Sequence, residues 1–516
     1  MSLDVADYRR LVDIGIALGA ERNHARLQER ILIEAKDLAR ADGGTLYLRN
    51  RDDELEFAIL RTDSLDLARG GTTGHEVELP PLPMRDEQGR RQTSHVAVHV
   101  AWTGETSVID DAYETEGFDF SGARAFDERK GYRSQSFLTV PLKTRAGRVV
   151  GVLQLINARD EERVGPFDRE RVPLVEALAA QAAVCLENHL LLKAQKDLFQ
   201  SFIELIAEAI DRKSPYTAGH CQRVPVIAQM LADAAMAREK GPLADFTLSA
   251  DEQEEFRLAA WLHDCGKITT PEHVVDKATR LETVHDRVSE VAARFAVLRL
   301  AGALPEGTEP PALADELAEG LAVIERINGG GESLADEDRQ RIEALGRLTW
   351  PDARGEHQPL LTADELDNLL IGRGTLTASE RNIINDHVAV TRELLERLPF
   401  PPELARVPEI AGDHHEHVDG SGYPRGREGN ELTVQARILA IADVFEALTA
   451  SDRPYKPPQP LSRALGIMAS MRDRGHLDPA LFDLFVTAGL PEDYGRRFLR
   501  PEQLDAVDVP ALLTPS

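Results

Sequence analysis

Several histidines and aspartates, in separate stretches of the chain, are candidate metal ligands. His263 and Asp264 end an apolar helical pattern, "EEFRLAAWLHDCGK", and Asp443 lies inside another, "ILAIADVFEALTA". His220 and His387 each stand near the start of a further predicted helix. A lone carboxylate within an apolar helix costs free energy unless a partner compensates its charge, and a metal ion would do so. Imidazole and carboxylate ligands suit iron, manganese, nickel or zinc.

His263–Asp264 is distinguished from a chance His-Asp pair by the other candidate ligands, His220, His387 and Asp443. A second pair, His285–Asp286, lies in the polar run "LETVHDRVSE" without such neighbours, and we assign it no function. Adjacent metals that share a carboxylate can activate a bridging water for attack on phosphorus. The pattern around the first pair is therefore typical of a metal-dependent hydrolase.

The densest stretch is "AGDHHEHVDGSGYPRG", which contains His414, His415 and His417. Helical spacing alone favours His414 with His417, three residues apart on nearly one face, or Asp413 with His417, four apart. His414 and His415 would lie about 100° apart on a regular helix. They could hold one ion only if the backbone bends there, as the Asp/Gly-rich sequence just beyond permits.

Length and composition bound the class of protein. The 516 residues exceed one ordinary core, so we expect two to four domains. The net charge of −28 repels phosphate backbones and argues against long nucleic acid as a partner, but not against a small phosphate ligand. No run approaches the ~18 apolar residues of a membrane helix and the start lacks a signal-peptide pattern, so we expect a cytoplasmic protein without a membrane segment. Cys185, Cys221 and Cys265 form no CxxC motif and are interpreted as reduced core residues.

Hydrophobic patterns divide the chain into segments. "RDDELEFAILRT" predicts a strand, and "SFLTVPLKTRAGRVVGVLQLINA" predicts a hairpin around a turn at Arg145–Gly147. Helical periodicity dominates from Arg171 onward. We expect an α/β domain over 1–170, a connecting helix over 171–212, an all-α domain over 213–475 with a polar helical insertion at about 277–372, and C-terminal helices with a tail over 476–516.

The connecting helix carries a heptad-like seam whose apolar positions alternate steps of three and four. Its members are Val175, Leu178, Ala182, Cys185, His189, Leu192, Lys196, Phe199, Ile203, Ile206 and Ile210. Such a seam is typical of a parallel coiled coil, with His189 and Lys196 as polar interruptions that can set its register. We expect a homodimer through this helix; the alternative is one long amphipathic helix packed on its own domain.

Three motifs in this order resemble the HD-GYP family of metal-dependent phosphohydrolases: "HDCGK", "HHEHVDGSGYPRG" and "ARILAIADVFEALTASDRPYK". The resemblance runs from about Ser201 to Met471, apart from the insertion. It implies an all-α domain with a metal centre, and a phosphodiesterase that opens cyclic di-GMP to pGpG and in some members on to GMP. Ser136–Ala158 resembles the last strands of GAF sensor domains, which implies an α/β domain that binds an unknown small ligand and regulates the enzyme.

The same resemblance implies roles for individual residues. The ligands of one metal would be His220, His263, Asp264 and Asp443. Asp264 would bridge to a second metal held by His387, His414 and His415, leaving His417 outside the first shell. A hydroxide between the two divalent ions, iron or manganese, would attack a 3′,5′-phosphodiester. Lys267, Arg453 and Lys456 would bind phosphate, and Tyr423 would shape the substrate site and contacts with partner proteins.

Two positions depart from the family pattern. Some members hold a third metal through a glutamate four residues before the first histidine, where this chain has Tyr216. Phenol is a poor ligand at neutral pH because its pKa is near 10, so we expect two metals. Cys265 replaces the usual aliphatic residue beside Asp264 and is interpreted as packing, with redox sensitivity as the minor alternative.

Three other functions fit parts of the sequence. The substrate could be another cyclic dinucleotide, such as 3′,3′-cyclic GMP-AMP, because pocket contacts decide this. The chain could also be a non-catalytic receptor that signals through the Gly422–Pro424 loop, although a pure receptor need not keep all seven ligands. It could finally be a scaffold whose GAF-like half carries the function.

Overall fold

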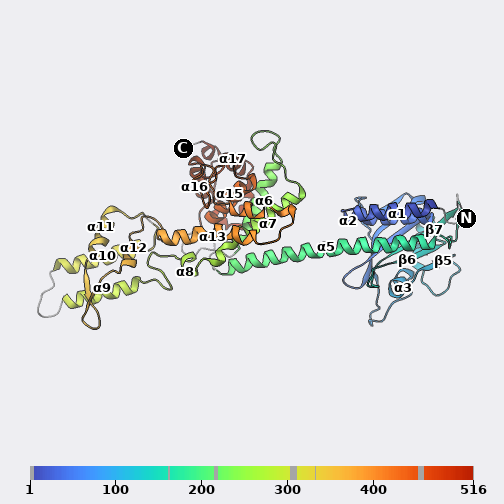
Figure 1. The fold of residues 1–516 in the computed structure, drawn as a ribbon, viewed down its shortest axis with the longest axis horizontal. Coiled ribbons are helices and arrows are strands. Elements are labelled where there is room, and N and C mark those ends of the chain that lie inside the picture. Colours follow the sequence, from blue (N-terminus) through green and yellow to red (C-terminus); the bar gives the residue numbers. More distant parts are fainter. Residues whose placement is uncertain are drawn as a thin grey trace. The chain divides into compact units, whose positions relative to one another are not determined.

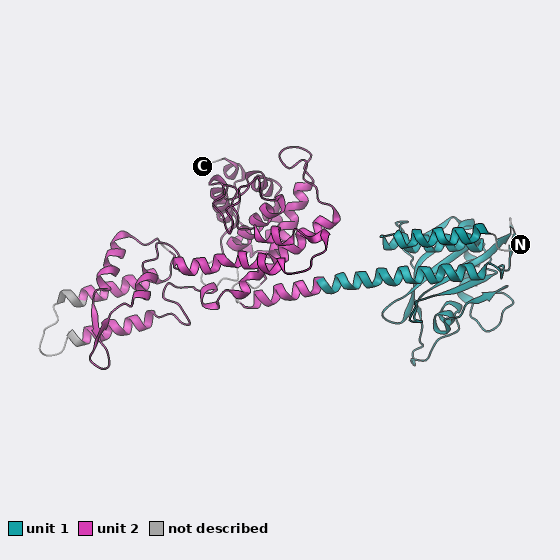
Figure 2. Ribbon diagram, viewed as in Figure 1, with its two compact units in different colours: residues 1–199 teal, residues 200–516 magenta. Residues whose placement is uncertain are grey.

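The computed structural model describes residues 5–160, 163–213, 219–302, 311–331, 333–450 and 458–514. The chain divides into two compact units, Met1–Phe199 and Gln200–Ser516, which Figure 2 shows in separate colours. The predicted residues Tyr216, Arg453 and Lys456 lie outside the described residues. Each unit is described by itself.

The first unit is an α/β domain built on an antiparallel sheet. Its strands follow the order β3-β2-β1-β7-β6-β5, with β4 paired to β2 and β8 to β7. The strands are β1 (Ala41–Arg49), β2 (Glu54–Thr62), β3 (Leu67–Gly70), β4 (Leu82–Pro83), β5 (Ser107–Ile109), β6 (Phe137–Lys143), β7 (Val149–Asp160) and β8 (Arg163–Gly165). The predicted hairpin is confirmed as β6 and β7, and its turn places Gly147 at φ 80°, a value that favours glycine.

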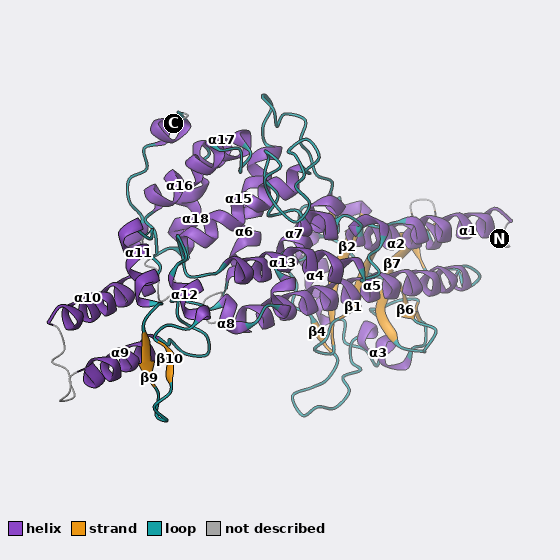
Figure 3. Cartoon of the chain, turned by 60° about the vertical axis from the view of Figure 1, so that its left-hand side comes forward, coloured by secondary structure: helices purple, strands orange, loops and turns teal. Residues whose placement is uncertain are grey.

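Helices cover both faces of this sheet (Figures 1 and 3). The helices of this unit are α1 (Val5–Ala20), α2 (His24–Ala39), α3 (Val96–Thr103) and α4 (Ser121–Lys130), with the short turn η1 (Asp63–Leu65). One core joins α1, α2 and the start of α5 to one face through Ile14, Leu32 and Leu178. A second core packs α3 and neighbouring loops on the other face around Val98 and Phe137.

The predicted connecting helix is α5, Val172–Lys213, a single helix of 42 residues. The ends of its predicted seam pack in two cores: Val175, Leu178 and Ala182 are buried in the first unit, and Ile203 and Ile210 in the second. The apolar residues in the middle of the seam are exposed: Leu192, Phe199 and Ile206. The buried side chains are therefore not available to a second chain. For them, packing on the chain's own domains is the correct interpretation.

By length and composition alone, α5 is long and apolar enough to cross a membrane. The apolar runs in the sequence did not predict such a segment. Length and composition are weak evidence, because a core helix of a globular domain passes the same test. Val175, Leu178 and Leu186 of α5 are buried against the first unit's own sheet and helices, as in such a core helix.

The core of the second unit is helical. It comprises α6 (His220–Met236), α7 (Ala250–Leu262), η2 (Cys265–Thr269), α8 (Glu272–Val275), α13 (Ala378–Glu396), η3 (Pro402–Leu404), α14 (Val407–Gly412), α15 (Val434–Thr449), α16 (Leu461–Asp473), α17 (Pro479–Thr487), α18 (Leu490–Phe498), η4 (Pro501–Gln503) and α19 (Val509–Leu513). The central helices α6, α7 and α15 meet around Ile227, Phe256 and Phe445, which are almost fully buried. This core positions the candidate metal ligands described below.

The insertion forms a lobe with its own hydrophobic core around Phe295, Ile324 and Ile342. It contains α9 (Val288–Gly302), α10 (Pro311–Asn328), α11 (Asp336–Leu345) and α12 (Ala363–Leu369). It also contains a two-stranded ribbon, β9 (Thr349–Pro351) with β10 (His357–Pro359), that the helical prediction missed. Buried Lys277 anchors the lobe, because its Nζ lies 2.7 Å from a carboxylate oxygen of Glu380 on α13.

Candidate metal centre

The structure brings all seven predicted ligands together in two groups. In each group the candidate ligand atoms lie within 4.8 Å of one another. The first group is His220 at the start of α6, His263 and Asp264 at the end of α7, and Asp443 on α15; the second is His387 on α13 with His414 and His415 after α14.

Nitrogen and carboxylate oxygen atoms face one another in the first group. The Nε2 atom of His220 lies 3.2 Å from Oδ2 of Asp264 and 3.2 Å from Oδ1 of Asp443. The Nε2 atom of His263 lies 3.3 Å from the same Oδ2 of Asp264. All four residues are buried, so water cannot solvate these charges freely.

Asp264 links the two groups. While its Oδ2 faces the first group, its Oδ1 lies 3.1 Å from Nε2 of His387 and 3.9 Å from Nε2 of His414. One carboxylate thus presents one oxygen to each set of imidazoles, which is the arrangement of a ligand that bridges two metal ions.

In three imidazoles, the hydrogen bond made by Nδ1 leaves Nε2 as the nitrogen that can bind a metal ion. The Nδ1–H groups of His263, His387 and His414 donate to backbone carbonyls three residues earlier, at 2.8, 2.5 and 2.6 Å. Their Nε2 atoms therefore carry the lone pair and point into the site. The Nε2 atoms of His220, His263, His387 and His414 and Oδ1 of Asp264 are buried with no hydrogen-bond partner in the described part of the chain. Buried polar atoms are rarely left unpaired, so this donor set fits a metal centre.

Protonation states of three candidate ligands also suit metal ligation, whereas the neighbouring carboxylates, despite burial, raise the pKa of His220 and raise that of His263 to about 9. Burial lowers the pKa of His415 to about 4 and holds the pKa of His414 well below its usual value, so both imidazoles are neutral at pH 7. Although burial opposes it, the neighbouring imidazoles of His220 and His263 hold the pKa of Asp443 well below its usual range. Neutral imidazole and ionised carboxylate are the forms that bind metals.

Glu446 is a site residue that sequence reasoning missed. It lies one turn after Asp443 on α15, is buried, and accepts a hydrogen bond from Nδ1–H of His220. Its other oxygen accepts from Nε of Arg223 at 2.7 Å. A carboxylate behind a metal-binding histidine orients the ring and raises its basicity. The available signal was the one used for Asp443, an acidic residue within the same apolar helix.

Gly266 lets the ligand-bearing segments approach one another. A Cβ atom at this position would lie 2.0 Å from the carbonyl oxygen of His387 and 2.6 Å from the backbone nitrogen of Thr391. The Gly266 N–H donates to Oγ1 of Thr391 at 2.8 Å. The glycine of the "HDCGK" motif therefore allows η2 to pack directly on α13, which places Asp264 beside His387.

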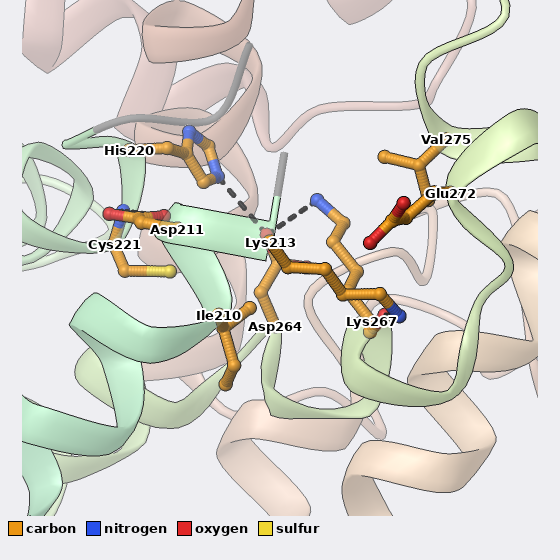
Figure 4. A pocket seen from close by; sticks show the side chains of 9 residues that line it. All are labelled: Ile210, Asp211, Lys213, His220, Cys221, Asp264, Lys267, Glu272 and Val275. Carbon is orange, nitrogen blue, oxygen red and sulfur yellow. Dashed lines mark hydrogen bonds and ion pairs between the residues drawn. The ribbon is translucent and has the colours of Figure 1, made fainter. Parts of the chain in front are cut away.

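Two of the predicted substrate-binding residues adjoin the ligands. Nζ of Lys267 lies 2.6 Å from Oδ2 of Asp264 (Figure 4), and its side chain is 26% exposed, so it can also reach a bound anion. The ring of Tyr423 stacks on His415 with centroids 4.9 Å apart. Arg453 and Lys456 lie outside the described residues, and their phosphate-binding role stays a prediction.

The stretch after α14 bends as the second ligand group requires. Helix α14 ends at Gly412, and His414 and His415 follow in a turn, so helical spacing does not apply to them. His417 belongs to neither group and stacks on His476 with centroids 4.2 Å apart.

Buried acids hold the loop that follows this turn. Asp413 pairs with Arg425 at 2.5 Å and with Arg427 at 2.7 Å. Glu416 accepts hydrogen bonds from the backbone nitrogens of the same two arginines at 2.7 and 2.9 Å. These contacts fix the loop that carries Tyr423.

Cys265 has the character expected of a packing residue. It is 7% exposed, and burial raises the pKa of its thiol to about 11. A protonated, buried thiol reacts slowly with oxidants.

Family models match two parts of the chain. Residues 24–186 match the GAF domain model, and residues 361–481 match an HD domain model. The HD match includes His387, His414, His415 and Asp443, whereas the other three predicted ligands precede the inserted lobe.

Curated relatives match a part of the chain of about 120 residues. Among them are "3'3'-cGAMP-specific phosphodiesterase 3" of Vibrio cholerae, 39% identical over 23% of this chain and 26% of the relative, and "Cyclic di-GMP phosphodiesterase" of Thermotoga maritima, 41% identical over 23% of this chain and 32% of the relative. The chain thus spans about a quarter to a third of the length of these relatives. The GAF domain of an Acinetobacter phosphoenolpyruvate-protein phosphotransferase is 16% identical, covers 36% of this chain and 95% of that one, and has a TM-score of 0.26.

Proposed function

We propose that this chain, which joins an N-terminal GAF domain to an HD domain related to the HD-GYP phosphodiesterases, is a metal-dependent phosphodiesterase of cyclic dinucleotides. The observation that carries the proposal is Asp264, whose two oxygens face two buried groups of imidazole nitrogens. We further propose that the protein acts in the cytoplasm.

The residues present fit two divalent ions, iron or manganese, held by His220, His263, Asp264 and Asp443 on one side and by Asp264, His387, His414 and His415 on the other. Bound there, the ions would supply Lewis acidity and lower the pKa of water for attack on phosphorus. The protein's own contribution is orientation: backbone carbonyls and Glu446 aim the imidazoles at the ions.

The substrate side of the site is formed by Lys267 and Tyr423. The Lys267 ammonium stays beside Asp264 and faces outward far enough to stabilise negative charge on a phosphate that is being cleaved. The ring of Tyr423, held against His415, presents an aromatic face at the same site. The exposed part of this loop is also our candidate surface for partner proteins.

We propose cyclic di-GMP as the substrate, opened to pGpG and on to GMP. The relative from Thermotoga maritima named for that activity supports this proposal. The Vibrio cholerae relative named for 3′,3′-cGAMP makes this dinucleotide the second candidate.

The function is tested by supplying both dinucleotides to protein reconstituted anaerobically with Fe(II) or with Mn(II), and by separating the products chromatographically. We expect turnover of at least one dinucleotide, and its loss after chelation. Tight binding without turnover in the metal-loaded protein would instead support a receptor.

A hollow in the GAF domain supports regulation by a small ligand. It encloses about 1150 Å³, part of it open to solvent. Six aromatic side chains contribute to its lining, as in many small-molecule sites: Tyr47, Phe57, Phe120, Phe126, Tyr132 and Phe137. We propose that this ligand regulates the phosphodiesterase.

We propose a homodimer through α5, in a register different from the one expected from the sequence. Val184, Leu191, Leu198 and Leu205, each seven residues after the last, are 38–60% exposed. Asn188, Gln195 and Phe202 lie between them and are exposed as well. Amides at seam positions such as Asn188 and Gln195 can specify the register of a parallel pair at a cost in stability, since each amide can both donate to and accept from its copy.

This register predicts a disulfide between chains. Replacing Leu191 with cysteine, in a Cys185→Ser background, should give a cross-linked dimer on mild oxidation, because equivalent seam positions lie close enough for a disulfide. Lys193→Cys in the same background is the matched control and should stay uncrosslinked, because Lys193 lies on the outer side of this register. A monomer by light scattering, or equal cross-linking of both variants, would contradict the dimer.

A further inference from the structure

The last turn of α5 ends against the proposed metal centre. Asp211 and Lys213 line one hollow with His220, Asp264 and Lys267 (Figure 4). All of these residues belong to the second unit. Neither Asp211 nor Lys213 belongs to the two ligand groups.

Asp211 fixes the backbone on both sides of His220. Its carboxylate accepts a hydrogen bond from the backbone N–H of Gly219 at 3.0 Å and from that of Cys221 at 3.3 Å. Helix α6 begins at His220, and the residue before it, Gly219, has no side chain that could cap the helix. The buried Asp211 therefore supplies the acceptor that the first turn of α6 needs.

Lys213 fixes the segment that follows Asp264. Its Nζ donates to the backbone carbonyl oxygens of Lys267 at 3.1 Å, Ile268 at 2.6 Å and Thr270 at 2.6 Å. These carbonyls lie at the end of η2, where a positive charge is favourable. The three contacts use the three hydrogens of the ammonium group, so Lys213 holds the backbone rather than a phosphate.

We propose that Asp211 and Lys213 are positioning residues through which the last turn of α5 sets the metal affinity of the centre. One residue holds the segment of His220 and the other holds the segment of Asp264, two ligands whose facing atoms lie 3.2 Å apart. A movement of this turn therefore changes both ligand-bearing segments together. The inference rests on the proposed metal centre and adds the residues that control it.

The test is a Mn(II) titration of the full-length chain, with free Mn(II) measured by electron paramagnetic resonance. Lys213→Met keeps most of the unbranched side chain and removes its donors, and should weaken the tightest Mn(II) binding by about 10- to 100-fold, as changes to residues that orient metal ligands do. Lys213→Arg restores a cationic donor and should recover most of the affinity. The kcat of Lys213→Met should fall while KM stays near the wild-type value, since Lys213 is not placed to touch substrate.

Arg212→Met is the matched control on the same turn. Arg212 is 79% exposed and pairs with Glu208 on its own helix, so this variant should bind Mn(II) like the wild type. Wild-type protein that binds no Mn(II), Fe(II) or other divalent ion would refute the metal centre itself. Wild-type binding with unchanged affinity in folded Lys213→Met would overturn this inference alone. If Lys213→Met does not fold, the same titration of Lys213→Gln tests the inference: weakened Mn(II) binding supports it, and unchanged affinity overturns it.

Discussion

Replacing Asp264 with alanine is expected to lower turnover of the cyclic dinucleotide to below about 1% of the wild-type rate and to remove tightly bound metal. Asp264 presents Oδ2 to His220 and His263 at 3.2 and 3.3 Å, and Oδ1 to His387 at 3.1 Å. The substitution therefore takes one ligand from each group at once. It also removes the carboxylate that pairs with Lys267.

The measurement compares turnover, metal content by mass spectrometry and the circular dichroism spectrum of wild type and variant. Asp286→Ala is the matched control, because Asp286 belongs to the other His-Asp pair and to neither ligand group. Its Oδ2 accepts from Asn328 at 2.7 Å within the inserted lobe, so its loss should affect lobe stability and leave metal content unchanged. A folded Asp264→Ala protein that keeps more than about 5% of the activity would refute the bridging role.

The grouping of the seven candidate ligands could be predicted because it depends on residue types in a motif that the family resemblance orders. Helical geometry would have paired His414 with His417. The structure shows why that rule does not apply: the helix ends at Gly412, and the two adjacent histidines lie in a turn. Because the backbone leaves the helical conformation there, the adjacent histidines His414 and His415 face one site, and His417 does not.

Glu446 and Gly266 could not be assigned from sequence, because their roles depend on tertiary contacts. Glu446 contacts His220, which lies 226 residues away in the chain. Gly266 is needed because the backbone of α13, more than a hundred residues later, passes where its Cβ would be. A local sequence pattern does not reveal contacts between residues so far apart in the chain.

The register of a dimer through α5 stays a prediction for a related reason. The helix carries two apolar stripes that are offset by one residue, and the sequence alone does not say which one the chain's own cores occupy. Leu178 and Ile203 at the ends of the predicted seam are buried, whereas its middle residue Leu192 is exposed like Leu191 of the neighbouring stripe. Burial within the chain therefore removes the ends of the predicted seam from a dimer contact and leaves both stripes exposed in the middle of the helix.

Single replacements in the "HHEH" stretch are expected to separate ligands from a neighbour. His414→Ala and His415→Ala should each lose the ion of the second group and lower turnover by at least about 100-fold, because each removes one of its few nitrogen ligands. His417→Ala should keep the metal and most of the activity. His417 stacks on His476, and its Nδ1 lies 2.9 Å from Oγ of Ser421, so its loss affects only the loop.

His417 is a matched control for this experiment because it has the same side chain, two residues from His415 and in the same loop. Metal content and turnover should be measured on all three variants at one protein concentration. Equal metal loss in His417→Ala would mean that the loop, rather than the ligand identity, sets metal binding. Full metal content in both His414→Ala and His415→Ala would refute the second group as a metal site, since buried imidazoles with lowered pKa values would then serve the core alone.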